Sequence, residues 1–115
     1  MELWFTEKSN DSVGLTLLIK EHLYHKESKY QTIDVLESAY YGKVLVIDKV
    51  VMLTERDEFI YHELLTHVPL QYMENPLSAL IIGGGDGGTA REVLKYRSVN
   101  RVVLVEIDEE VIETS

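Results

Sequence analysis

The sequence predicts an α/β protein in which a small antiparallel β module precedes the start of a parallel βαβ sheet. Runs of strand-favouring residues fill the first half, a segment with apolar residues at helical spacing follows, and a glycine-rich turn then lies between an apolar strand and a helix. We expect residues 1–53 to form the β module, 54–76 a connecting amphipathic helix and linker, and 77–115 the first, incomplete part of a nucleoside-binding domain.

The composition limits the possible classes of protein. With 45% hydrophobic and 27% charged residues, the 115-residue chain should be globular. The absence of cysteine excludes disulfides and thiolate metal sites. A formal net charge of −9, with scattered basic residues, disfavours nucleic acid and suits a small cationic substrate. Neither a signal peptide nor a bilayer-length apolar run is present, so we expect a cytoplasmic protein without membrane partners.

The β module should contain five strands. Five β-favouring runs occupy residues 1–5, 15–24, 29–37, 44–47 and 50–53. Only Asp48 and Lys49 separate the last two runs, which indicates a hairpin. Lysine is a poor second residue for the type I′ turn, because that position needs a positive φ.

An amphipathic helix should follow the β module. Thr54 can cap its first turn, and Asp57 lies near the positive end of the helix dipole. Five apolar residues then recur at helical spacing and should form the buried face: Ile60, Tyr61, Leu64, Leu65 and Val68. Pro69 should end or kink the helix near His67, and Asn75 with Pro76 forms the best linker candidate.

The glycine-rich turn carries the clearest functional signal. Gly83, Gly85 and Gly88 fit the pattern G-x-G-x-x-G, and a second strand ends at Glu106, about 20 residues further on. Such glycines let the backbone turn tightly and approach a ligand, while the acid can accept from two ribose hydroxyls. The pattern predicts a nucleoside or nucleotide site, with a tight structural turn as the alternative. Asp86 disfavours a phosphate in this loop and favours a positive group.

The last segment looks like the beginning of a larger sheet. Asp108 should cap a further short helix after the second parallel strand. Two parallel strands with one and a half helices leave the apolar residues 102–105 poorly covered. We therefore expect the front part of a larger α/β protein, or a sheet that a partner completes.

The histidines do not predict a metal site. His62 and His67 resemble the H-E-x-x-H motif but are one residue too far apart, so their side chains should point about 140° apart on a helix. His22 and His25 lie three apart in an expected strand and should face opposite sides of the sheet.

Several motifs together resemble one known family. They are Trp4-Phe5-Thr6-Glu7, Tyr30-Gln31, the segment from Thr54 to Glu63, His67-Val68-Pro69-Leu70, Gly83-Gly84-Gly85-Asp86-Gly87-Gly88, Arg91-Glu92-Val93 and Val105-Glu106-Ile107-Asp108. Over its entire length the chain resembles the spermidine synthase family of polyamine aminopropyltransferases.

The resemblance implies an N-terminal antiparallel β domain followed by a Rossmann-like, methyltransferase-type domain, in dimers or tetramers. The implied reaction transfers an aminopropyl group from decarboxylated S-adenosylmethionine to putrescine, giving spermidine and 5′-methylthioadenosine. Decarboxylated S-adenosylmethionine would be a co-substrate, with no separate cofactor. Homo-oligomers and small-molecule substrates are the partners we expect.

The resemblance also implies roles for individual residues. Gln31 would contact the methylthioadenosine moiety, and Glu106 would accept from its ribose, next to the loop backbone at Gly83 and Gly85. Asp86 would hold amino groups of the polyamine or the donor.

On the amine side, Tyr61 and His62 match positions that face the polyamine in this family. The family's general base, an aspartate, belongs to a later motif that these residues do not reach, so the 115 residues alone should be inactive. Two alternatives are an amine N-methyltransferase that uses S-adenosylmethionine and a truncated, non-catalytic interaction module. Asp86 argues against a third, an NAD-dependent oxidoreductase.

Overall fold

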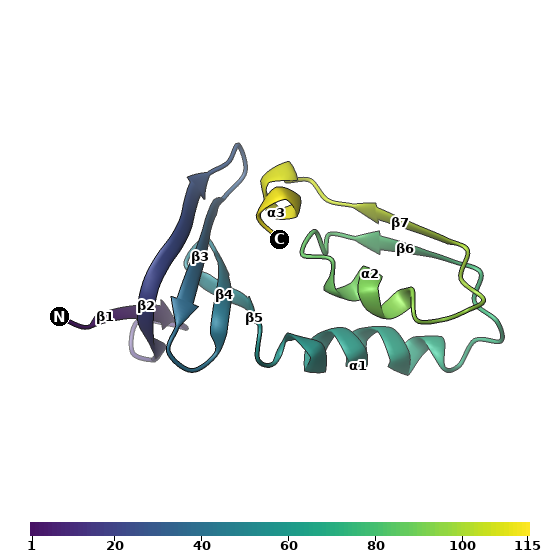
Figure 1. Cartoon of the computed structure of the whole chain (residues 1–115), viewed down its shortest axis with the longest axis horizontal. Helices are drawn as coiled ribbons and strands as arrows, with labels where there is room; N and C mark the ends of the chain where they lie inside the picture. The colour runs from purple at the N-terminus through teal and green to yellow at the C-terminus, as the bar shows by residue number, and fades with distance from the viewer. The chain divides into compact units, whose positions relative to one another are not determined.

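The computed structural model describes residues 1–115, which divide into two compact units, Met1–Asp57 and Glu58–Ser115 (Figure 1). The first unit is all β, and the second contains three helices and two strands. We expected the first helix to connect the two units. Instead, it belongs to the second unit. None of the helices is long and apolar enough to cross a bilayer.

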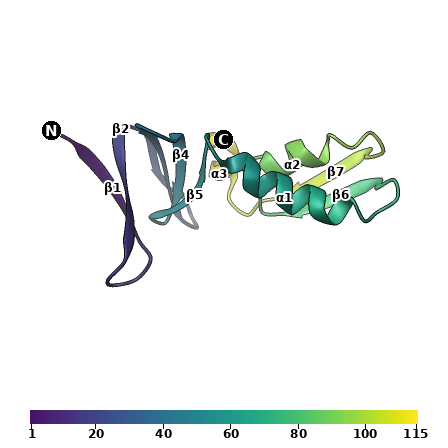
Figure 2. The ribbon, with the colours of Figure 1, turned by 90° about the horizontal axis from the view of Figure 1, so that it is seen from below.

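The first unit is an antiparallel sheet with its five strands in sequential order (Figure 2). The strands are β1 (Leu3–Lys8), β2 (Gly14–Glu27), β3 (Thr32–Ser38), β4 (Gly42–Ile47) and β5 (Val50–Thr54). One side of this sheet carries the core, formed by Leu17, Ile19, Leu36, Val44 and Val46. Alternating apolar residues favour strands of this kind because one face can be buried while the other meets water. The predicted antiparallel module is confirmed.

The β2 strand is less regular than the sequence indicated. Its pairing with β3 shifts register between Ile19 and Glu21 and again between His22 and Tyr24. An extra residue in one strand breaks the alternation of side chains between the two faces. Our expectation that His22 and His25 face opposite sides is therefore wrong, because both rings contact Asp34.

The turn between β4 and β5 confirms the expected hairpin. Asp48 and Lys49 both adopt positive φ, 49° and 67°, as a type I′ turn requires. The Asp48 side chain also accepts from the Thr32 N–H at 2.9 Å, which ties the turn to β3. Lys49 holds an unfavourable backbone conformation because the rest of the hairpin imposes it.

The helix α1 (Glu58–Leu70) turns a different face inward from the one its apolar spacing predicted. Its buried residues are His62 and Thr66. The five apolar residues of the expected face, Ile60, Tyr61, Leu64, Leu65 and Val68, are exposed. Periodicity shows which side chains share a face, but the close packing of α1 on α2 (Gly88–Val93) decides which face is buried.

The end of α1 also differs from the prediction. The helix continues through Pro69 to Leu70 instead of ending near His67. Near the end of a helix a proline removes only one backbone hydrogen bond, and the His67 carbonyl still accepts from the Gln71 N–H at 3.1 Å. Its cost is therefore small enough for the last turn to form.

The second unit contains the expected strand, helix and strand. The strands β6 (Ser78–Ile82) and β7 (Arg101–Val105) are parallel, and α2 lies between them in the sequence. Asp108 caps α3 (Glu109–Thr114) by accepting from the Glu110 N–H at 3.1 Å. Leu80 and Ile82 remain largely exposed on one face of the two strands.

Replacing Lys49 with glycine should stabilise the β4–β5 hairpin by about 0.5–1 kcal/mol, because glycine adopts positive φ without the steric cost of a Cβ. Urea unfolding of the wild type and Lys49→Gly measures the difference. Lys43→Gly in β4 is the matched control and should destabilise by about 0.5–1 kcal/mol. A less stable Lys49→Gly protein would contradict the turn conformation.

Candidate functional site

The glycine loop runs from the end of β6 to the start of α2. Its turn closes with a hydrogen bond from the Gly87 N–H to the Gly84 carbonyl at 3.0 Å, and both residues have positive φ. The Gly83 N–H donates to the Val105 carbonyl at 2.7 Å, so the loop begins in contact with the end of β7. The loop therefore lies at the carboxyl edge of the two parallel strands, where open α/β sheets bind ligands.

Glu106 lies directly against this loop. One of its carboxylate oxygens, Oε2, accepts from the Gly85 N–H at 3.0 Å, and the other, Oε1, accepts from the Asp108 N–H at 3.2 Å. A Cβ on Gly85 would lie 2.8 Å from Cγ of Glu106, so only glycine permits this approach. The structure thus brings together Gly85 and Glu106. Each carboxylate oxygen keeps a lone pair for a hydroxyl donor.

Asp86 is fixed within the loop by two neighbours. Its Oδ1 atom accepts from the Gly88 N–H at 2.8 Å and lies 3.2 Å from Nε2 of His62. The side chain is about one-fifth exposed, so the carboxylate is accessible although its orientation is constrained. A carboxylate held in this way presents a localised negative charge at the loop.

His62 is buried between two carboxylates. Its Nδ1 atom hydrogen-bonds Glu58 Oε2 at 2.5 Å, its Nε2 faces Asp86, and its side chain is only 5% exposed. The ring packs on Gly88, where a Cβ would lie 2.2–2.6 Å from the ring atoms. The contact of His62 Nε2 with Asp86 Oδ1 therefore helps to hold the Asp86 carboxylate in place. Tyr61, by contrast, is 64% exposed and meets the His62 ring edge-on, with centroids 5.4 Å apart.

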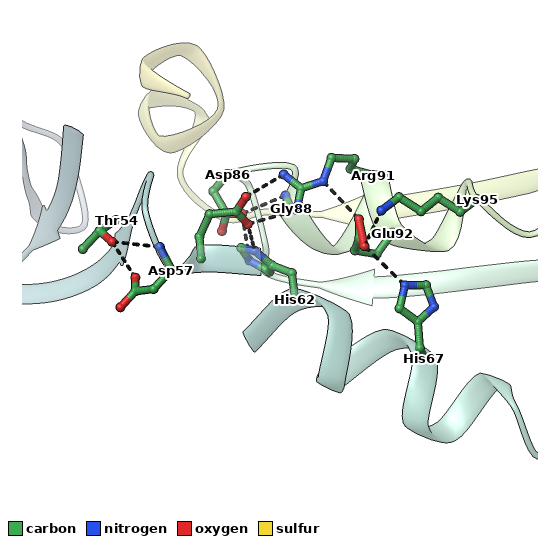
Figure 3. Close-up of polar contacts among 10 residues, drawn as sticks. Thr54, Asp57, His62, His67, Asp86, Gly88, Arg91, Glu92 and Lys95 are labelled. Atoms are coloured by element: carbon green, nitrogen blue, oxygen red, sulfur yellow. Dashed lines mark hydrogen bonds and ion pairs between the residues drawn. The ribbon is translucent and has the colours of Figure 1, made fainter. Parts of the chain in front are cut away.

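An ion-pair network extends from His62 along α1 and α2 (Figure 3). Arg91 binds Glu58 with both terminal nitrogens, at 2.8 and 3.0 Å, and donates from Nε to Glu92 at 3.1 Å. The Arg91 guanidinium lowers the pKa of Glu58, and the two carboxylates together raise the pKa of Arg91. This bidentate pair fixes the distance between the two helices.

Glu92 ends the network as a fully buried carboxylate. Besides Arg91, it accepts from Lys95 Nζ at 2.6 Å and lies 3.2 Å from Nε2 of His67. The hydrogen bond from Lys95, followed by those from Arg91 and His67, lowers the pKa of Glu92 to about 2. Sequence reasoning missed this cluster, although the i,i+3 spacing of Glu92 and Lys95, at the end of α2 and just after it, was a detectable signal.

Gln31 lies in the first unit, in the turn between β2 and β3. Its N–H donates to Ser28 Oγ at 3.1 Å, and its carbonyl accepts from the Ser28 N–H at 2.8 Å. Gln31 thus belongs to a different unit from the glycine loop, and its role stays a prediction.

A glycine loop at the carboxyl edge of parallel strands, with an acid after the second strand, is the arrangement typical of Rossmann-like nucleoside-binding domains. Comparison with known families is more specific. Residues 58–115 match the spermine/spermidine synthase domain, and residues 3–55 match the spermidine synthase tetramerisation domain. The chain belongs to the spermine/spermidine synthase family, which confirms the resemblance and the fold class.

Individual relatives agree with the family. The polyamine aminopropyltransferase of Alkaliphilus metalliredigens is 48% identical, and the alignment covers all of this chain and 40% of the relative's length. That of Methanocaldococcus jannaschii is 50% identical, and the alignment covers 96% of this chain and 38% of the relative's length. The spermidine synthase of Thermotoga maritima has a TM-score of 0.95 and 47% identity, over 97% of this chain and 40% of its own. The chain thus spans about two-fifths of the length of these relatives.

Gly88→Ala should destabilise the protein by about 3 kcal/mol, because its methyl group would overlap the His62 ring. Gly83→Ala is the control: it meets no atom within 4 Å and should cost only about 1–2 kcal/mol, from its positive φ. Urea unfolding measures both. The double variant Gly88→Ala/His62→Ala should be more stable than the sum of the single effects predicts. Strict additivity would contradict the contact.

Glu92→Gln should lower stability at pH 7 by removing the charge that Arg91, Lys95 and His67 surround. Because the folded pKa is lowered from 4.5 to about 2, the stabilisation is complete above pH 4.5 and is lost as the pH falls toward 2. The difference between the urea midpoints of wild type and variant should therefore shrink between pH 7 and pH 3. Glu63→Gln, on the exposed side of α1, should show little difference at either pH. A constant difference for Glu92→Gln would contradict the lowered pKa.

Proposed function

We propose that this chain forms the donor-binding part of an enzyme that transfers an aminopropyl group from decarboxylated S-adenosylmethionine to putrescine. The products would be spermidine and 5′-methylthioadenosine. One observation carries the proposal: Asp86 is held inside the glycine loop, next to a carboxylate suited to a ribose. Relatives named polyamine aminopropyltransferase support it, as does a spermidine synthase, 47% identical, solved with the transition-state analogue AdoDATO.

Glu106 would bind the ribose of the donor. Its two oxygens are oriented by backbone N–H groups, yet each can accept another hydrogen bond. The close approach at Gly85 lets the nucleoside lie along the loop backbone. Gln31 would contact the methylthioadenosine moiety, a role that rests on the family resemblance. No cofactor besides the co-substrate is proposed.

Asp86 would select the donor by charge. S-adenosylmethionine carries both an ammonium and a carboxylate, whereas the decarboxylated donor lacks the carboxylate. A fixed negative charge attracts the first group and repels the second, so specificity comes from repulsion as well as attraction. The hydrogen bond from Gly88 and the nearby His62 ring keep Asp86 from turning away.

The amine acceptor would approach from the Tyr61 side. The exposed Tyr61 ring can contact a polyamine directly, while the buried His62 would act through Asp86 as a positioning residue. In the reaction, the neutral amine nitrogen attacks the carbon that joins the aminopropyl group to sulfur. The bond between this carbon and sulfur breaks, and sulfur keeps the electron pair as a thioether. The nitrogen then loses a proton to a carboxylate base, which the family places in a later motif.

Oligomerisation would accompany this activity. The match of residues 3–55 to a tetramerisation domain supports a homo-oligomer of the complete protein. The antiparallel unit β1–β5 would provide the contacts between subunits.

Asp86→Asn in the complete native protein tests the function. With putrescine, mass spectrometry should detect spermidine and 5′-methylthioadenosine from the decarboxylated donor. The variant should lose about 10–100-fold in kcat/KM, as expected for a charged hydrogen bond of about 1.5–3 kcal/mol. S-adenosylmethionine should compete with the decarboxylated donor more strongly in the variant than in the wild type. Asp11→Asn, on an exposed turn, should change neither kcat/KM nor this competition.

Two outcomes would overturn the proposal. Methylation of an amine by S-adenosylmethionine, with no use of the decarboxylated donor, would identify an N-methyltransferase. Absence of turnover with both donors would identify a non-catalytic module.

A further inference from the structure

Two histidines and an aspartate meet where β2 pairs with β3, outside the site described above. His22 Nε2 lies 2.7 Å from Asp34 Oδ1, and His25 Nδ1 lies 2.6 Å from the same oxygen. The three potential ligand atoms are all within 4.8 Å of one another. Three groups that each ligate metals therefore converge on one point.

The irregular pairing of the two strands creates this convergence. His25 is directly opposite Asp34, and the register shift between His22 and Tyr24 returns His22 to the same face. The two rings pack edge-on, with centroids 5.9 Å apart. The arrangement thus depends on the backbone of two paired strands and not on a flexible loop.

We propose that His22, His25 and Asp34 form a binding site for a divalent transition-metal ion of the zinc type. Imidazole nitrogen and carboxylate oxygen are ligands that zinc prefers, and three protein ligands leave one position for water or another group. The histidine side chains are about half exposed and Asp34 is 17% exposed, so an ion can enter from solvent. The formal net charge of −9 also favours a cation.

The two nitrogen–oxygen distances require little adjustment on binding. Zinc–nitrogen and zinc–oxygen bonds of about 2.0–2.1 Å place tetrahedral ligand atoms about 3.3 Å apart. Both nitrogens now lie slightly closer than that to Asp34 Oδ1, so small rotations of exposed side chains make room for the ion. The ion would then replace two hydrogen bonds with a cross-strand link at the point where the β2–β3 pairing is irregular.

Calorimetric titration of the full chain with zinc sulfate tests the site. We expect one zinc ion per chain and a rise in Tm, because the ion binds the folded state. Removing a residue that only hydrogen-bonds a metal ligand typically lowers metal affinity by about 10–100-fold. The double variant His22→Asn/His25→Asn removes two ligands themselves, so its zinc affinity should fall by at least about 100-fold. His67→Gln removes a histidine from α1 and should bind zinc as the wild type does.

Cobalt(II) provides a second readout on the same proteins. The wild type and His67→Gln should give the visible absorption of a low-coordinate cobalt site, and the double variant should not. Circular dichroism confirms that each variant is folded. Absence of saturable zinc binding would overturn the proposal. Equal binding by the wild type and the double variant would also overturn it, since the ion would then occupy other carboxylates.

Discussion

The close contact between the His62 ring and Gly88 is the constraint on which the second unit depends. A side chain at position 88 would occupy the space that the ring fills, so the first residue of α2 must be glycine for α1 to approach this closely. That approach places His62 next to Asp86. It also places Glu58 within hydrogen-bonding distance of Arg91. Packing of two helices and orientation of the loop carboxylate thus follow from the same missing Cβ.

A buried carboxylate is the second requirement for this arrangement. Burying a charge is unfavourable unless hydrogen bonds and opposite charges replace water, and Glu92 obtains both from Arg91, Lys95 and His67. Helix α1 therefore turns polar residues toward α2 although its apolar residues share a continuous face. Charge satisfaction and the small space at Gly88 determine which face of α1 meets α2.

Local patterns predicted the parts of the molecule that local physics determines. The glycine loop, its flanking strands and the Asp48 turn followed from residue type and spacing alone. The buried face of α1 did not, because it depends on contacts across more than 20 residues. The meeting of His22 and His25 was missed for a related reason, since a strand irregularity is invisible to a rule of strict alternation.

In the proposed function, the loop also explains how two acids with different tasks would lie near one ligand. Glu106 is held by the Gly85 N–H and Asp86 by the Gly88 N–H, so N–H groups of one short backbone segment fix both carboxylates. Neither orientation depends on a long side chain finding its place when a ligand arrives. Pre-organisation of this kind lowers the entropic cost of binding. It would also support the proposed charge selection, because a carboxylate free to rotate could move away from a repelled group, whereas one fixed by the backbone cannot.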